Sequence, residues 1–299
     1  MYILINMVLL RQTYKHTKVA IQDITKYTYK NIFSLSIVEF DKACVMSAPE
    51  QIDAYRIFWI KKGSGKYYID FESYSFDDNI LFFLSPGQVF SVDSEAIEEA
   101  YKLTFLRDFY CIQTHDKEVA CNGVLFNNIY DTPFLQPTEN DTVKLELIIT
   151  SLVDELNQSE TGQYDMLQAY LKQFIVHAVR IKKEHYQIKD DIESQLFKDF
   201  SLLVEQNYKT LHSVTEYANR LGISPKSLTK HFQKTGIQTP SDFIKNRIIL
   251  EAKRQLLYSS DSVKQIAFNL GYNDPAYFTR FFTKSTTKSP IHFKTDHKK

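Results

Sequence analysis

Two pairs of side chains, Thr229-Lys230 and Thr279-Arg280, stand 50 residues apart in this sequence and offer its clearest chemistry. Each pair is flanked by large apolar residues, namely Leu228 and Phe232 in the first case and Phe278 and Phe282 in the second. Lysine and arginine can donate hydrogen bonds to guanine O6 and N7, and threonine can bond to several bases. The chemistry is therefore recognition of a polyanion by hydrogen bonds rather than the making or breaking of covalent bonds.

The elements that must hold these pairs form an internal repeat, and each copy opens with the same helix-start signal. Ser213-Val-Thr-Glu216 and Ser262-Val-Lys-Gln265 each have a serine N-cap followed three residues later by an acid or an amide, which is a capping box. Apolar residues then recur at helical spacing: Val214, Tyr217, Ala218 and Leu221 in one copy, and Val263, Ile266, Ala267 and Leu270 in the other. The pattern predicts a short amphipathic helix in each copy.

A second helix follows each of these after a sharp turn. Gly222 and Gly271 are placed to end the first helices, because glycine tolerates the left-handed backbone of a helix end. Ser224-Pro225 and Asp274-Pro275 then supply a cap and a proline that suits the first helical position. Two helices joined by a tight glycine turn form a helix-turn-helix, whose second helix can enter the major groove of DNA. We predict two such units, over 213–236 and 262–286.

The segment 240–259 between the units is predicted to be a helix that holds them at a fixed separation. Its apolar stripe sits opposite Arg247 and Arg254 and consists of Ile244, Ile248, Ala252 and Leu256. With the repeat, this helix makes residues 191–299 an all-α domain.

These residues resemble the DNA-binding domain of the AraC/XylS family of bacterial regulators, over roughly residues 193–299. The residues that match are Tyr217, Ala218, Leu221, Gly222, Ser224, Leu228, Phe232, Gly236, Arg247, Ala252, Leu256, Ile266, Ala267, Gly271, Tyr272, Asp274, Tyr277, Phe278, Arg280, Phe281, Phe282, Ser289, Pro290 and Phe293. One departure is Thr286-Thr287, where the family usually has a glycine after the last recognition helix.

The resemblance implies a sequence-specific transcription regulator, an activator, that reads two successive major grooves of double-stranded DNA and works with RNA polymerase. The base-reading positions it implies are Lys226, Thr229, Lys230, Ala276, Tyr277, Thr279 and Arg280. The positions it implies for phosphate contacts are Ser213, Ser262, His231, Lys234, Lys264 and Lys284. Tyr277 could instead brace the helix packing, and a residue such as Lys226 or Thr229 taken alone could be ordinary surface.

The N-terminal half has the composition of a β domain. Five short runs are rich in β-branched and aromatic residues: 37–40, 55–60, 67–71, 80–84 and 100–105. Turn signals separate them at Lys62-Gly-Ser-Gly65, Asp77-Asp-Asn79 and Ser85-Pro-Gly87. They predict a sandwich or small barrel, which resembles the cupin-like effector-binding domain of many family members and is assigned to residues 1–140. The predicted fold class is α+β.

Such a barrel could hold a small-molecule effector. The candidate wall residues are Phe58, Trp59, Tyr67, Tyr68, Phe82 and Phe83, with the alternative that these aromatics simply fill the core. A cupin-type enzyme would need a metal cluster with a His-x-His pair, and the eight histidines form none. We therefore expect no enzyme, no metal and no cofactor. A further alternative is that the helical domain binds only another protein.

Residues 141–185 predict an antiparallel helical hairpin, with a linker up to residue 190. Leu145, Ile148, Ile149, Leu152 and Leu156 repeat at helical spacing in its first half. In the family such helices pair two subunits, which implies a homodimer. Burial of the hairpin against its own barrel is the alternative.

Charge and composition predict an intracellular protein, and the resemblance to a family of bacterial regulators implies the bacterial cytoplasm, at the nucleoid. Residues 191–299 contain 17 Lys+Arg and 10 Asp+Glu, so they carry +7, and the remaining 19 and 26 give residues 1–190 a charge of −7. Such a split favours a polyanionic partner for the basic half. Cys44, Cys111 and Cys121 show no disulfide or zinc spacing, and the apolar start, 1–10, lacks the features of a signal peptide. No stretch is long and apolar enough to predict a membrane span.

Overall fold

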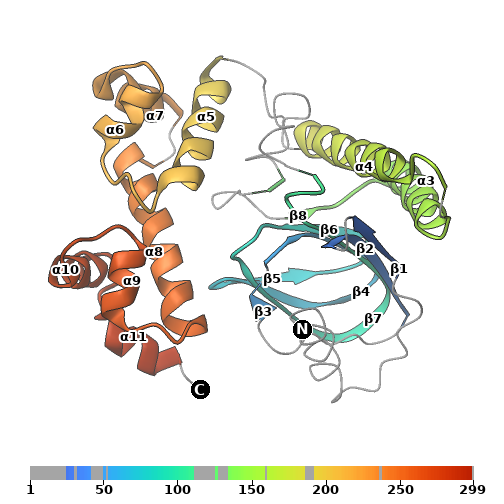
Figure 1. Ribbon diagram of the computed structural model, residues 1–299, viewed down its shortest axis with the longest axis horizontal. Coiled ribbons are helices and arrows are strands. Elements are labelled where there is room, and N and C mark those ends of the chain that lie inside the picture. The colour runs from blue at the N-terminus through green and yellow to red at the C-terminus, as the bar shows by residue number, and fades with distance from the viewer. Residues whose placement is uncertain are drawn as a thin grey trace.

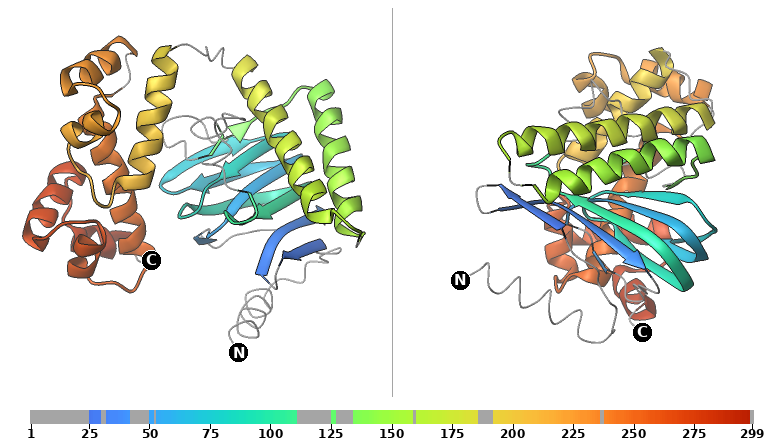
Figure 2. Two further views of the ribbon diagram at one scale, coloured as in Figure 1. Left: turned by 45° about the horizontal axis from the view of Figure 1, so that its top comes forward. Right: turned by 90° about the vertical axis from the view of Figure 1, so that its right-hand side faces the viewer.

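The computed structural model describes residues 25–29, 32–41, 50–51, 53–110, 125–126, 134–158, 160–185, 192–235 and 238–297. The three cysteines, the apolar start, His16, His115 and Gly236 lie outside these residues. A sheet, a pair of helices and a C-terminal group of seven helices make up the described part of the chain, with the sheet between the two helical layers (Figures 1 and 2). This is the predicted order, a sheet followed by a helical C-terminal domain.

One antiparallel sheet contains all eight described strands. They are β1 (Thr25–Tyr29), β2 (Ile32–Asp41), β3 (Glu50–Gln51), β4 (Tyr55–Ile69), β5 (Glu72–Phe76), β6 (Ile80–Leu84), β7 (Val89–Phe105) and β8 (Phe134–Leu135). The strand order is β1-β2-β7-β4-β6-β8, with β3 on β7 and β5 on β4. The order starts at β1 and stops at β8 without pairing the two, so the sheet of the described residues is open and the predicted β-barrel is not closed there.

The turn predicted at Lys62-Gly-Ser-Gly65 is also wrong, because β4 continues through these residues without reversing direction. Gly63 pairs with Ile97 and Ser64 with Ala96 on β7, and the register shifts between Ile60 and Lys66. Irregular pairing of this kind bends a strand without ending it, and glycine accommodates the bend. By contrast, the turns predicted around Asn79 and Gly87 are present, and both residues have left-handed φ values, 60° and 88°.

Helices α3 (Glu139–Leu156) and α4 (Gln163–His185) cover one face of the sheet as an antiparallel pair (Figure 2). The Thr138 side chain caps α3, and Gly162 (φ 86°) opens the turn into α4. The buried stripe of both helices shares one core with Ile57, Trp59 and other residues of that sheet face. The hairpin is therefore buried against its own sheet, the alternative to a purely intersubunit role.

The other sheet face is filled by its own side chains. Phe58 and Phe82 lie opposite each other on β4 and β6, and the Tyr67 ring centroid is 4.1 Å from that of Phe82. Phe90 of β7 closes the cluster at 5.8 Å from Phe58. Because the sheet curls around these rings, this face forms a packed core of its own.

The C-terminal helices pack around a third core. They are α5 (Ile192–Asn207), α6 (Val214–Arg220), α7 (Pro225–Thr235), α8 (Pro240–Tyr258), α9 (Val263–Asn269), α10 (Pro275–Thr286) and α11 (Pro290–His297). The central helix α8 contributes Ile244, Ile248, Ala252 and Leu256 to this core, as its predicted stripe requires. The helices α6 and α7 lie at one end of α8, and α9 to α11 at the other (Figure 1).

Candidate nucleic-acid interface

The first helix of each predicted unit begins with the expected capping box. In α6 the Ser213 hydroxyl accepts from the Glu216 backbone N–H at 3.3 Å, and the Glu216 carboxylate accepts from the Ser213 N–H at 3.0 Å. Ser262 and Gln265 make the same reciprocal bonds in α9 at 3.2 and 2.8 Å. These bonds satisfy helix N–H groups that have no partner within the helix.

Each first helix ends in a left-handed glycine, as predicted. Gly222 has φ 70° and Gly271 has φ 79°. The amide of the next residue, Ile223 or Tyr272, returns to a carbonyl five residues back, on Ala218 at 3.0 Å or Ala267 at 2.9 Å. This is a Schellman turn, which redirects the chain sharply and leaves few unpaired carbonyls. The two units therefore share their turn geometry.

The second helices bury one face and expose the other. Leu228 and Phe232 of α7, and Phe278 and Phe282 of α10, are at most 1% exposed. The opposite face of α7 presents Lys226 and Lys230, which are four residues apart and thus on one side of the helix.

In α10 the implied base-reading positions that are exposed are Ala276, Tyr277 and Arg280. The Arg280 side chain is 72% exposed, with one carboxylate oxygen of Asp274 at 3.8 Å. Tyr277 is 56% exposed, and its ring lies 6.0 Å from that of Tyr272, so it is free to make contacts on its outer side. Thr229 and Thr279 are half-buried, and their hydroxyls donate to Pro225 and Pro275 carbonyls at 2.9 Å. Five of the seven implied base-reading residues thus point outward, and the two threonines pack along their own helices.

The six residues that the resemblance implies for phosphate contacts lie in different environments. Lys234, Lys264 and Lys284 are exposed, with the Lys264 ammonium 5.9 Å from the Phe268 ring. The hydroxyls of Ser213 and Ser262 are used in the capping boxes. His231 is half-buried, and its Nε2 is buried without a hydrogen bond to a described residue, so solvent and a phosphate group do not reach this nitrogen.

Arg247 and Arg254 of α8 are buried rather than solvated, at 5% and 2% exposure. Arg247 Nε lies 2.7 Å from Glu205 of α5, and its guanidinium stacks 3.8 Å from the Tyr208 ring centroid. Burial alone would lower the pKa of Arg247, yet the nearby carboxylates and Tyr208 hold it above its usual value. Burial raises the pKa of Tyr208 to about 12. Arg247 therefore ties α8 to α5 and serves the internal structure of the domain.

A contact that sequence reasoning missed joins the two units. Gly271 lies so close to the segment before α6 that a Cβ there would overlap the Lys209 carbonyl. The next residue, Tyr272, stacks on His212, with ring centroids 4.7 Å apart and planes inclined by 27°. Glycine at position 271 thus has a second purpose beyond the left-handed turn. No signal in one sequence distinguishes it from Gly222, around which the structure leaves open space.

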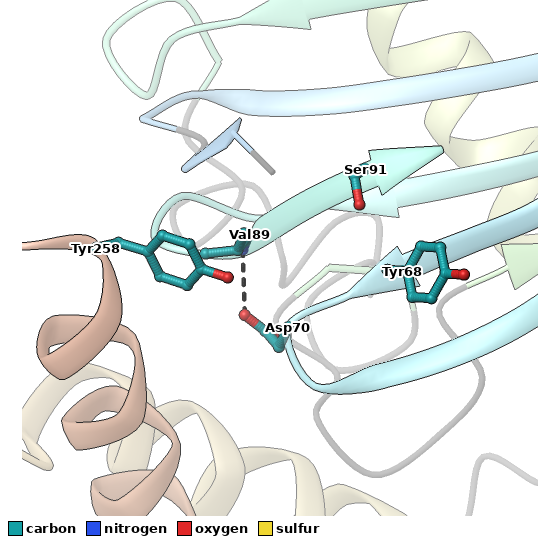
Figure 3. Close-up of a pocket in the computed structure, with 5 residues that line it drawn as sticks. All are labelled: Tyr68, Asp70, Val89, Ser91 and Tyr258. Atoms are coloured by element: carbon teal, nitrogen blue, oxygen red, sulfur yellow. Dashed lines mark hydrogen bonds between the residues drawn. The ribbon is translucent and has the colours of Figure 1, made fainter. Parts of the chain in front are cut away.

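The six candidate effector residues are not brought together. Trp59 and Phe83 lie in the core under α3 and α4, whereas Phe58, Tyr67 and Phe82 lie in the core on the opposite face. Neighbouring residues on a strand point to opposite faces, so adjacent pairs cannot line one cavity. Tyr68 borders an open cleft of about 270 Å³, shared with Asp70, Val89, Ser91 and Tyr258 (Figure 3). In that cleft the Tyr258 ring of α8 extends toward the sheet.

Among the described residues, no group of three or more His, Cys, Asp and Glu side chains is arranged to hold a metal ion. No helix in the described part of the chain combines the length and apolarity that crossing a membrane requires.

Residues 217–296 match a family of helix-turn-helix domains. The chain is 31% identical over 105 residues to the HTH-type transcriptional activator RhaS of Yersinia pestis, and equally to that of Yersinia pseudotuberculosis. This match covers 35% of the chain and 38% of each relative, so the chain spans less than half the length of these relatives. Among solved structures, fatty-acid-bound ToxT of Vibrio cholerae is 20% identical, with a TM-score of 0.43, over 89% of this chain and 97% of ToxT. The C-terminal part of this chain therefore contains a helix-turn-helix domain of the AraC type.

Proposed function

We propose that this protein is a sequence-specific DNA-binding transcription regulator, an activator, whose helices α7 and α10 read two successive major grooves of double-stranded DNA. The observation that carries the proposal is the shared construction of the two units. Each packs an apolar face into one core and exposes cationic side chains on its second helix, Lys226 and Lys230 on α7 and Arg280 on α10. Helix α8 packs against helices of both units, and we propose that it fixes their separation.

The charges of the domain support the same proposal. Residues 191–299 carry 17 Lys+Arg against 10 Asp+Glu. A basic surface releases counterions from the phosphate backbone, which supplies the sequence-independent part of the affinity. Lys230 and Arg280 then supply discrimination, since each bidentate contact to a guanine adds about 1–3 kcal/mol. Lys234, Lys264 and Lys284 are the proposed phosphate contacts with the clearest access to solvent.

The remaining parts of the proposal concern partners. RhaS carries the name of a transcriptional activator, and we extend activation, with RNA polymerase as the partner, to this chain.

A homodimer through residues 141–185 is supported by Val143 and Leu147, which lie on the outer side of α3 at 55% and 65% exposure. ToxT has been solved with a fatty acid bound, and we keep a small-molecule effector for the N-terminal half. The proposed place of action is the bacterial cytoplasm, at the nucleoid.

Binding of the full chain to a labelled duplex recovered from a random library tests the proposal. We expect log affinity to fall linearly with log salt, with the negative slope typical of phosphate neutralisation. Arg280→Ala should weaken binding to the selected duplex by about 1–3 kcal/mol. Lys66→Ala removes the same charge from an exposed position of β4 and serves as the matched control.

Two results would contradict the proposal. If no duplex is enriched over repeated selection, the chain does not recognise DNA sequence. If Arg280→Ala and Lys66→Ala behave alike while wild-type binding depends on sequence, α10 is not the reading helix, and a protein partner becomes the better interpretation of its exposed face.

A further inference from the structure

The connection between α5 and α6, residues 208–212, is fastened to the first helix-turn-helix unit. The His212 backbone N–H donates to the Glu216 carboxylate at 3.3 Å. The Tyr217 hydroxyl, on a buried ring of α6, donates to the Leu211 carbonyl at 3.0 Å. Because both bonds run between the connection and α6, the connection moves with the first unit as one body.

The same connection contacts the turn between α9 and α10 in the second unit. The Lys209 carbonyl lies where a Cβ on residue 271 would stand, and glycine at that position allows the approach. Tyr272 then stacks on His212, with ring centroids 4.7 Å apart. The buried Nε2 of His212 makes no hydrogen bond with a described residue. The face of the imidazole ring, rather than a hydrogen bond from this nitrogen, therefore meets the second unit.

Tyr272 connects His212 with the second recognition helix, α10. Its ring centroid lies 5.4 Å from that of Phe278, 5.5 Å from that of Phe281 and 6.0 Å from that of Tyr277. Tyr277 is one of the residues proposed to contact bases. A single buried ring thus separates a residue fixed to the first unit from a reading position of the second.

This contact supplies an attachment that α8 does not. The chain leaves α8 at Ser259, whose backbone is extended (φ −113°, ψ 162°), and residues 259–262 before α9 are not helical. A body held near one end of a helix can still rotate about that point, so a second point of attachment is needed to define its orientation. Arg247 of α8 stacks 3.8 Å from the Tyr208 ring centroid, which also holds the start of the connection in place.

We infer that His212 and Tyr272 are positioning residues, which fix the orientation of α10 relative to α7 and so set the spacing between the two groups of base pairs that the chain accepts. The effect on DNA rests on the proposed function, whereas the coupling of the two units does not. One additional base pair between the groups moves the second by about 3.4 Å along the duplex and about 35° around it. Units in a fixed orientation lose base contacts on such a duplex, and units free to rotate keep them.

Three full-chain variants test the spacing. His212→Ala removes the stacking ring, whereas His212→Phe keeps a ring at the same place and is the rescue variant. Gly222→Ala is the stability control, because it strains the left-handed turn of the first unit and its Cβ would have no neighbour within 4 Å. Fluorescence anisotropy measures binding to the selected duplex and to duplexes with one base pair added or removed between the two groups, which single base-pair substitutions locate beforehand.

We expect wild type and His212→Phe to bind the respaced duplexes about tenfold more weakly than the selected duplex, the effect of one lost base contact. His212→Ala should reduce this ratio about fivefold, a coupling at the lower end of the usual range. Gly222→Ala should weaken binding to all duplexes alike and keep the wild-type ratio. The inference is wrong if His212→Ala keeps that ratio, if His212→Phe does not restore it, or if Gly222→Ala lowers it equally.

A measurement without DNA separates this inference from the proposed function. Urea unfolding of His212→Ala, Tyr272→Leu and the double variant gives a double-mutant cycle. The double variant should lose less stability than the sum of the two single losses, because the two rings share one contact. Additive losses would overturn the coupling of the units. If wild type binds no duplex, the proposed function fails, and this cycle alone decides whether His212 and Tyr272 couple the units.

Discussion

The two helix-turn-helix units have nearly the same local construction and different tertiary environments. Both begin with a capping box and both turn at a left-handed glycine. The turn at Gly222 faces open space, whereas the turn at Gly271 is pressed against the Lys209 carbonyl and the His212 ring. Repetition of local signals therefore produced two similar helix pairs. Of the two glycine turns, the one at Gly271 packs against the segment before α6, and the one at Gly222 makes no such contact.

Replacing the two turn glycines measures this difference and should give the largest effect. Gly222→Ala is expected to cost about 1–2 kcal/mol, the penalty of left-handed backbone for a residue with a Cβ. Gly271→Ala bears a similar penalty plus about 1–3 kcal/mol for overpacking against Lys209. Urea unfolding followed by circular dichroism gives both free energies. Equal losses would show that the Gly271 turn relaxes freely and that the second unit is no more constrained than the first.

Changes on the two recognition helices compare what each unit reads. Arg280→Ala and Lys230→Ala should each relax preference at one base position by about 1–3 kcal/mol. The two relaxed positions should lie roughly one helical turn apart, about 10 base pairs, because the units are proposed to enter successive grooves. Competition binding with singly substituted duplexes locates them. Relaxation at a single shared position would mean that only one unit contacts bases.

The end of α10 offers a smaller, stabilising test. Thr287 adopts a left-handed φ of 62°, where glycine is the better residue. Thr287→Gly should raise the free energy of unfolding by about 1 kcal/mol, since relief of strain exceeds the added entropy of the unfolded chain. Thr286→Gly is the matched control, because Thr286 is helical and should lose stability there. A loss of stability in Thr287→Gly would show that the threonine hydroxyl contributes more than its backbone strain costs.

The capping boxes differ in a way that pH can reveal, with the smallest expected effect. Hydrogen bonds from the Ser213 side chain and backbone lower the pKa of Glu216, whereas Gln265 in the second box does not titrate. A carboxylate with a lowered folded pKa stabilises the fold above its unfolded pKa and loses that contribution as the pH falls through the folded pKa. Wild type should therefore lose part of the α6 cap in acid.

Glu216→Gln copies the second box and should flatten this acid dependence, leaving stability near neutral pH slightly reduced. Thermal unfolding across the acidic range, followed for wild type and variant in parallel, provides the measurement. Parallel curves throughout would mean that protonation of Glu216 does not reach the cap.

The N-terminal half shows where sequence patterns were less informative. The strands from Ile80 to Leu84 and around Ile57 were predicted from β-rich composition and are present. The glycines at 63 and 65 were interpreted as a turn, yet β4 pairs with β7 on both sides of Gly63 and the chain does not reverse there. The glycines indicate that the backbone can bend at this point. Pairing with the neighbouring strand determines whether the chain reverses direction.

Among the site residues, the sequence by itself determined the caps, the glycine turns and the buried faces, because these depend on residues within about one helical turn of each other. It also determined which side of α7 and α10 carries Lys230 and Arg280, since burial of Phe232 and Phe282 leaves a single outer face. Only the tertiary structure decided that the buried Arg254 side chain donates to the carboxylate of Asp70, 184 residues away in the sequence. No local pattern encodes such a pairing, because the energy of a buried charge depends on which distant groups surround it.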